Sequence, residues 1–177
     1  CYTFDVCCPI VSGTWKAIRS AVTVALTGVD QMQQGEKSVF SLCRPPGHHA
    51  SKDMAGGYCY MNNAAIAAQA HLDYGAPRVA ILDVDYHHGN GSQSIFYDRK
   101  DVLYASLHAR PEDEYPFLMG YANEIGTGEG KGYNLNIPMP IGTTFDLYKN
   151  NLKIALKQIS DYDPEVLVLS LGVDTFE

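Results

Sequence analysis

The sequence has no Cys-x-x-Cys pair. Its five cysteines, Cys1, Cys7, Cys8, Cys43 and Cys59, are odd in number. This pattern argues against a disulfide framework and against a cysteine zinc site, because both need cysteines in pairs at suitable spacing. A reducing, cytoplasmic compartment is therefore expected.

Positive charge is also scarce, with 13 Lys and Arg against 20 Asp and Glu and a net charge of −7. No basic patch interrupts this balance, so binding to nucleic acid or to an anionic membrane is not expected. No apolar run approaches the roughly 18 residues that cross a bilayer, and the first residues do not form a signal peptide. We expect a soluble protein with a small cationic ligand.

What the sequence does contain is typical of a globular domain. Of its 177 residues, 46% are hydrophobic and 19% are charged, which indicates one folding unit or part of one. No internal repeat, low-complexity tract or domain linker is evident, so residues 1–177 are expected to form a single domain. The chain begins at a cysteine and ends just after an apolar run, and is therefore expected to be a piece of a longer protein.

Apolar periodicity predicts helices that alternate with short strands. Residues 12–35 place apolar side chains at steps of three and four, as in an amphipathic helix, with Ser12 or Thr14 as N-cap and Gly35 as terminator. Residues 78–85 form a continuous apolar run, as in a strand covered on both faces. The remaining expected elements are strands at 38–43, 101–108 and 165–174 and helices at 60–75, 92–98 and 144–160, the last capped by Thr143 or Thr144.

This alternation predicts an α/β fold of three layers, α/β/α, with a mainly parallel sheet between helices on both faces. Residues 109–142, rich in Gly, Pro and Tyr, are predicted to form a long loop. Long loops in compact domains are usually functional or disordered.

Asp or His follows all four predicted strands. The strand ends read RPPGHHA, DVDYHHGNG, SLH and LGVD. Ligands of parallel α/β sheets bind beyond the carboxyl ends of the strands. The repeated residue types therefore predict one site at this edge of the sheet.

The second strand end has the spacing of metal ligands. Asp83, Asp85 and His87 lie two residues apart, so their side chains share one face while the backbone stays extended. Asp85 and His87 can bind one ion, with Asp174 as third ligand, and a catalytic zinc keeps three protein ligands and an open position. The alternative is that Asp85 and Asp174 cap helices and that His87 is an ordinary packed side chain.

The pair His48 and His49 follows RPPG, whose rigid turn can present both imidazoles. Beside a metal-activated water, one imidazole could accept a proton while the other stabilises charge or protonates the leaving amine. Each needs an orienting partner, and Asp83 and Asn90 are suitable acceptors.

Three further features are open to two interpretations. Gly57 permits close approach of the backbone. Tyr58 could line a channel or could be an ordinary packed aromatic. The acidic run 112–114 is either a solvated turn or a rim that attracts a cationic substrate. The glycine-rich stretch 126–134 lacks the spacing of a phosphate loop, so nucleotide binding is rejected.

These motifs resemble the zinc-dependent histone deacetylase family, in particular its bacterial acetylpolyamine amidohydrolases. The blocks RPPGHHA, GGYCYMNNAAIAA, ILDVDYHHGNGSQSIFY, SLH, GTGEGKGYNLNIPMP and LSLGVDTFE follow one another in the family's order over almost the whole chain. The resemblance implies an arginase/deacetylase-like fold that lacks the family's N-terminal strand and C-terminal portion.

The resemblance also implies roles for individual residues. It makes Asp85, His87 and Asp174 the ligands of one zinc ion, pairs His48 with Asp83 and His49 with Asn90, and makes His49 the general base and acid. Gly57 and Tyr58 match the substrate channel. A structural potassium ion would use Asp83, Asp85, His87, Ser106 and Leu107, and a second monovalent site would use Phe96, Arg99, Val102 and Tyr133.

Two departures from the family qualify these roles. Position 90 is Asn where some relatives have Asp, which lowers the charge behind His49. The family's catalytic tyrosine, a hydrogen-bond donor to the oxyanion, lies well beyond the last zinc ligand, and the printed sequence stops three residues after Asp174.

The sequence thus predicts a zinc-dependent amidohydrolase that removes an acetyl group from an acetylpolyamine or acetyl-lysine. One alternative is a non-catalytic or vestigial module that keeps the fold. Another is a binuclear manganese ureohydrolase, which would need further Asp ligands where His88 and Asn90 stand. Iron or cobalt could replace zinc on the same ligands, and unpaired sheet edges favour a homo-oligomer.

Overall fold

Four parallel strands form the centre of the fold. The computed structural model describes residues 2–3 and 5–174. Strands β3 (Val79–Asp83), β4 (Val102–Ala109), β5 (Asn134–Met139) and β6 (Val166–Ser170) lie in the order β5-β4-β3-β6. Every neighbouring pair is parallel, so all four carboxyl ends meet at one edge of the sheet.

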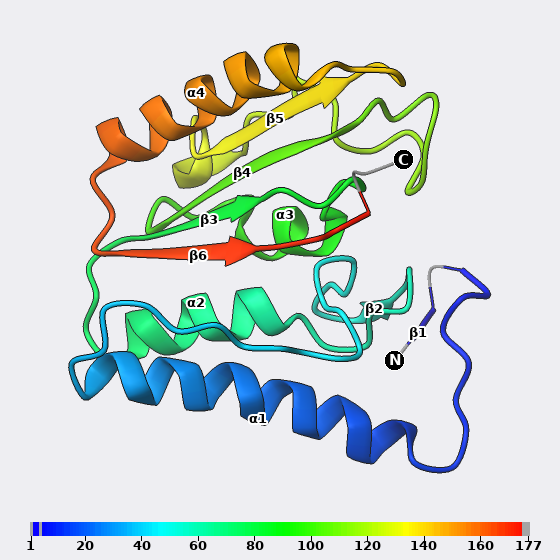
Figure 1. Cartoon of the computed structure of the whole chain (residues 1–177), viewed down its shortest axis with the longest axis vertical. Coiled ribbons are helices and arrows are strands. Elements are labelled where there is room, and N and C mark those ends of the chain that lie inside the picture. The colour runs from blue at the N-terminus through cyan, green and yellow to red at the C-terminus, as the bar shows by residue number, and fades with distance from the viewer. Residues whose placement is uncertain (1, 4, 175–177) are drawn as a thin grey trace.

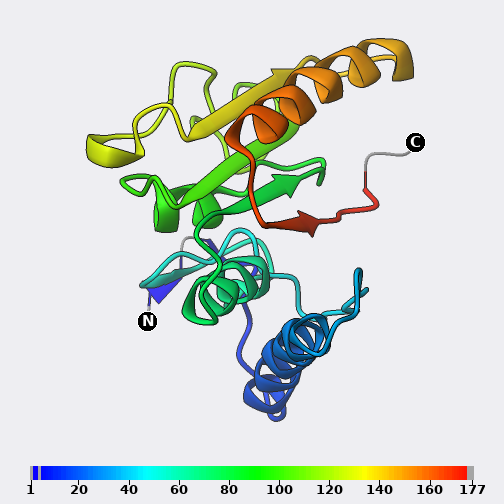
Figure 2. The ribbon, with the colours of Figure 1, turned by 90° about the vertical axis from the view of Figure 1, so that its left-hand side faces the viewer.

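Helices cover both faces of this sheet, which confirms the predicted α/β/α layers. Helix α4 (Phe145–Tyr162) lies on one face, and α2 (Asn63–Asp73) and α3 (Asn90–Phe96) lie on the other (Figure 1). Helix α1 (Thr14–Gln33) packs against α2, farther from the sheet (Figure 2). No helix among the described residues has the length and apolar character needed to cross a membrane.

Each face of the sheet has its own apolar core. Ala80, Leu82 and Leu103 pack with Ala155 and Ile159 on the α4 face. The alternate strand residues, including Val79, Ile81 and Tyr104, pack with alanines of α2 on the opposite face. Both faces of β3 are therefore buried, which explains why its sequence is a continuous apolar run.

The prediction of a strand at residues 38–43 is wrong. These residues form no ladder with the described strands. Their side chains still alternate as in a strand: Ser41 and Cys43 hydrogen-bond to carbonyls of α1, whereas Phe40 and Leu42 are 71% and 77% exposed. The alternation of side chains reflects packing of one side of this segment against α1. A strand also needs a hydrogen-bonded neighbouring strand, which is lacking here among the described residues.

The prediction of a long loop at residues 109–142 is wrong for residues 134–139, because β5 lies there. In this strand the polar side chains of Asn134 and Asn136 are buried, while Leu135 and Ile137 pack on the α4 face. Pro138 within the run also resembles loop sequence, but β5 is an edge strand, where proline is tolerated.

Smaller differences occur at the element boundaries. Gly13, rather than Ser12 or Thr14, is the N-cap of α1, whereas Thr144 caps α4 through a bond to Leu147 N–H. Two short parallel strands, β1 (Tyr2–Thr3) and β2 (Met54–Ala55), form a separate pair. Cys1 and the last three residues of the LSLGVDTFE motif lie outside the described residues.

Candidate active site

Asp85, His87 and Asp174 meet beyond the ends of β3 and β6. One donor atom of each lies within 4.8 Å of the other two. His87 Nδ1 lies 2.9 Å from Asp174 Oδ2 and 3.3 Å from Asp85 Oδ1. Two carboxylate oxygens and one imidazole nitrogen are a donor set that zinc accepts with a fourth position open. The residues present therefore fit the ion that the sequence implied.

Backbone amides hold both carboxylates of this cluster. The His87 N–H donates to Asp85 Oδ1 at 2.8 Å, and the Tyr86 N–H donates to Asp174 Oδ1 at 3.1 Å. Gly172 must lack a side chain, because a Cβ there would collide with the Asp85 carboxylate. Burial opposes ionisation of Asp85, but bonds from His87 and the charge of His48 outweigh it and lower its pKa to about 2.

His48 is bonded to a fully buried carboxylate. Its Nδ1 lies 3.0 Å from Asp83 Oδ2, which also accepts a hydrogen bond from the Tyr104 hydroxyl at 3.1 Å. Burial by itself would lower the pKa of His48, but Asp83, assisted by Asp85 and Asp174, outweighs burial and raises the pKa to about 9. Without a metal, His48 is therefore an imidazolium at neutral pH.

His49 has the opposite protonation state. Its Nδ1 lies 2.8 Å from Asn90 Oδ1, at the start of α3. An amide oxygen only accepts, so Nδ1 carries the proton and Nε2 has a lone pair. Burial and then the charge of His48, whose ring centroid lies 4.1 Å away, lower the pKa of His49 to about 3. The two neighbouring imidazoles are thus charged and neutral, respectively.

Gly57 and Tyr58 form a tight turn beside His49. Gly56 and Cys59 bond to each other across the turn, and its two central residues have φ of 51° and 65°. Positive φ at both positions is the requirement of a type I′ turn. A Cβ at Gly57 would collide with the His49 ring. Tyr58 is 63% exposed, so it is not an ordinary packed core aromatic.

Tyr115 is a site residue that sequence reasoning missed. Its ring meets the His49 ring edge-on, with centroids 4.8 Å apart, and lies 6.3 Å from the His87 ring. Its hydroxyl donates to Asp5 Oδ2. The only sequence signal was its place in the long loop, since no periodicity marks it.

The acidic run 112–114 is divided among different contacts. Asp113 pairs with Arg110 at 2.8 Å, so its charge is largely balanced. Glu114 accepts a hydrogen bond from the Tyr86 hydroxyl at 3.3 Å, next to His87. Glu112 is exposed.

Of the residues suggested for potassium, Asp83, Ser106 and Leu107 lie in β3 and β4, whereas Asp85 and His87 belong to the metal cluster itself. Asp83 and Ser106 are paired in the β3–β4 register, and Leu107 follows Ser106 in β4. The Ser106 hydroxyl lies 2.8 Å from His108 Nδ1. The backbone carbonyls and side chains of Asp83, Ser106 and Leu107 therefore come from two adjacent strands.

Of the residues suggested for a second monovalent ion, Phe96 ends α3 and Arg99 follows it, whereas Val102 begins β4 and Tyr133 directly precedes β5. The carbonyl of Phe96 accepts from Arg99 N–H, and that of Tyr133 accepts from Tyr104 N–H, next to Val102 on β4. The Arg99 guanidinium pairs with a nearby carboxylate, Asp101, at 2.7 Å.

A buried polar network behind the site was also missed. Gln93 Oε1 lies within 3.1 Å of His88 Nε2 and accepts from the side-chain amides of Asn134 and Asn136. Gln93 Nε2 in turn donates to Glu124, whose carboxylate holds backbone amides of the long loop. The network thus joins α3, β5 and the loop that carries Tyr115.

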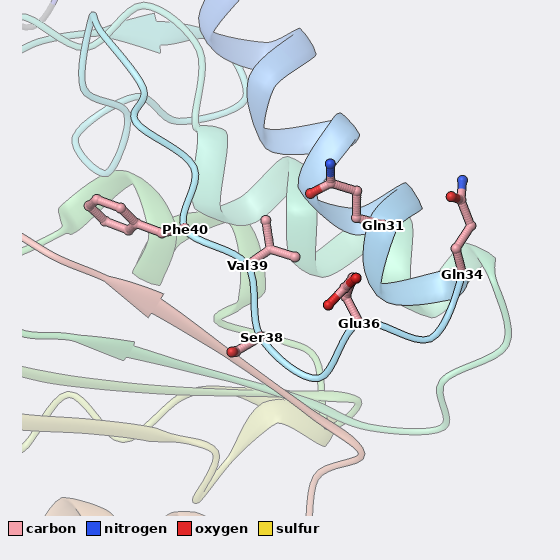
Figure 3. A pocket seen from close by; sticks show the side chains of 6 residues that line it. All are labelled: Gln31, Gln34, Glu36, Ser38, Val39 and Phe40. Atoms are coloured by element: carbon pink, nitrogen blue, oxygen red, sulfur yellow. The ribbon is translucent and has the colours of Figure 1, made fainter.

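A separate depression of about 570 Å³ lies away from this site (Figure 3). Its walls come from the end of α1 and the segment after it: Gln31, Gln34, Glu36, Ser38, Val39 and Phe40. It contains none of the predicted site residues and only one acidic side chain, Glu36.

Comparison with known proteins gives one consistent result. A model of the histone deacetylase domain matches residues 2–177. Acetylpolyamine amidohydrolase 2 of Pseudomonas aeruginosa is 58% identical, over 99% of this chain and 51% of that protein. Acetylpolyamine amidohydrolase of Mycoplana ramosa is 54% identical, over 95% of this chain and 49% of that protein.

A solved structure gives the same result for the fold. The crystal structure of acetylpolyamine aminohydrolase from Burkholderia pseudomallei superposes with a TM-score of 0.96 at 47% identity, over 99% of this chain and 51% of that one. The chain thus spans about half the length of the relatives it matches.

Proposed function

Because the chain belongs to the histone deacetylase family, we propose that it serves the hydrolysis of an acetylated primary amine. The observation that carries this proposal is the convergence of Asp85, His87 and Asp174 next to two imidazoles in opposite protonation states. Several relatives are named acetylpolyamine amidohydrolases, which favours an acetylated polyamine as substrate, with acetyl-lysine as the second candidate.

We assign one zinc ion to the Asp85, His87 and Asp174 cluster. A bound zinc would polarise the acetyl carbonyl and acidify water. The described residues contain only this one group of three candidate ligands. A second metal ion would need a further ligand near position 88, but the His88 side chain is turned toward Gln93. A binuclear site is therefore not favoured.

The chain's own residues divide the proton transfers. His49 Nε2 is unprotonated at neutral pH and can accept the proton of an attacking water, while Asn90 holds Nδ1. The same nitrogen then delivers that proton to the departing amine. His48, hydrogen-bonded to Asp83, would stabilise negative charge that develops on the acyl oxygen.

The same strand ends supply the proposed potassium site. Asp83, Asp85 and His87 would share it with Ser106 and Leu107, and a monovalent cation there would offset the buried carboxylate of Asp83. The net charge of −7 suits a cationic substrate. Glu114, at the edge of the site, is the member of the acidic run placed to attract it.

Acetate release tests the proposal. The chain is supplied with one equivalent of zinc and given an N-acetylated diamine or an acetyl-lysine peptide. We expect turnover that His49→Ala abolishes, and one zinc per chain that Asp174→Ala removes. Asp161→Ala is the matched control, since this carboxylate pairs with Lys157 on the exposed face of α4. Tight binding of one zinc without acetate from either substrate would reject hydrolysis and favour a non-catalytic module.

A further inference from the structure

One carboxylate joins three distant segments of the chain beside His49. Asp5 Oδ1 accepts a hydrogen bond from Cys7 N–H at 2.7 Å. Asp5 Oδ2 accepts from Gly57 N–H at 3.0 Å and from the Tyr115 hydroxyl at 2.5 Å. The N-terminal segment, the tight turn and the long loop therefore meet at a single side chain.

Both groups held by Oδ2 touch the same imidazole. Tyr115 packs edge-on against the His49 ring at a centroid distance of 4.8 Å. Gly57 lies so close to this ring that even a methyl group would not fit between them. We propose that Asp5 is a positioning residue, which fixes these two walls and thereby the orientation of the His49 imidazole.

The backbone of the turn needs such support. Gly57 and Tyr58 both have positive φ, and for a residue with a Cβ, such as Tyr58, this conformation is unfavourable. Amides in turns of this kind point into a concavity that suits an anion. The Asp5 carboxylate occupies this position at Gly57, so it stabilises the conformation that keeps the glycine against His49.

The charges are consistent with a permanent link. Burial of Asp5 is outweighed by its bonds from Tyr115, Gly57 and Cys7, so its pKa is lowered and it is ionised at neutral pH. Burial and then the nearby Asp5 charge raise the pKa of Tyr115. The tyrosine hydroxyl therefore keeps its proton and remains a donor at neutral pH.

A double-mutant cycle tests the proposal, which rests on the proposed function of His49. Asp5→Ala, Tyr115→Phe and the double variant are compared with wild type. Tyr74→Phe is the control, because its hydroxyl bonds to Asp30 at 2.9 Å on the exposed surface, far from His49 in the fold. The first readout is the NMR spectrum of histidine-labelled, metal-free protein, which needs no turnover.

We expect the His49 ring signals to shift in both single variants, with no further shift in the double variant and no change in Tyr74→Phe. Zinc-loaded protein should lose about tenfold in kcat in Tyr115→Phe, the cost of one charged hydrogen bond, and at least as much in Asp5→Ala, which also removes the acceptor of Gly57 N–H. The double variant should lose no more than Asp5→Ala. Unchanged His49 signals in Asp5→Ala or Tyr115→Phe would overturn the proposal.

Two other outcomes are also decisive. If Asp5→Ala raises KM equally in the presence and absence of the Tyr115 hydroxyl, Asp5 binds substrate directly and the positioning role is wrong. If no variant, including wild type, turns over, the proposed function fails, and the NMR cycle alone then decides whether Asp5 positions His49.

Discussion

The buried pair of His48 and Asp83 makes a prediction about stability and pH. Replacing Asp83 with Asn removes the charge that holds His48 as a cation but keeps an oxygen acceptor of similar size. Burial is then opposed only by the charges of Asp85 and Asp174, so the pKa of the His48 imidazole falls. The variant should therefore lose the part of its stability that depends on a proton at His48.

The size of this effect follows from the pKa change. The pKa of His48 rises from 6.5 to about 9 on folding. A raised pKa stabilises the folded state most below the unfolded value, and this contribution disappears as pH rises through the folded value. At 1.36 kcal/mol for each pH unit between the two, His48 contributes about 3 kcal/mol at pH 5 and less than about 1 kcal/mol at pH 9.

Urea unfolding of metal-free protein between pH 5 and pH 9, followed by circular dichroism, measures this contribution. The difference in unfolding free energy between wild type and Asp83→Asn should shrink by about 3 kcal/mol across this range. Any cost of the substitution that does not depend on pH cancels in the comparison.

Asp101→Asn is the control for the same change of side chain. Asp101 is partly exposed, and its hydrogen bond from Arg99 helps to lower its pKa below 3.8, so it exchanges no proton between pH 5 and pH 9. Its difference from wild type should be flat. Parallel curves for wild type and Asp83→Asn would refute the charged state assigned to His48.

Three further predictions test packing and the metal site. Asn62→Ala should cost about 2–3 kcal/mol in chemical unfolding, because the side chain caps α2 and makes two more buried hydrogen bonds; a cost under about 0.5 kcal/mol would contradict these bonds. Leu103→Ala, fully buried, should cost about 3 kcal/mol, against less than about 1 kcal/mol for Leu167→Ala, which is 45% exposed; equal costs would contradict the core assignment. Gly172→Ala should weaken zinc binding at least about tenfold by calorimetry, since the added Cβ displaces the Asp85 carboxylate, and an unchanged Kd would show that this carboxylate can move freely.

Much of the fold could be predicted because its signals are local. The buried strands at 78–85 and 101–108 and the long amphipathic helices follow from periodicity within one segment. The two errors, at residues 38–43 and in β5, have a common cause. Each depended on what lies beside the segment. Residues 38–43 lie against α1 rather than beside a strand, and the asparagines of β5 are buried in a polar network.

The candidate site divides in the same way. The sequence by itself determined which residue types stand at the strand ends. Because parallel topology brings every carboxyl end to one edge of the sheet, Asp85, His87 and Asp174 could be named as one group from the sequence. Only the tertiary structure decided that His48 is charged and His49 neutral, because burial and neighbouring charges set a pKa. It alone also revealed Asp5 and Tyr115, which are 110 residues apart and carry no motif, because a hydrogen bond across that separation exists only once the chain has folded.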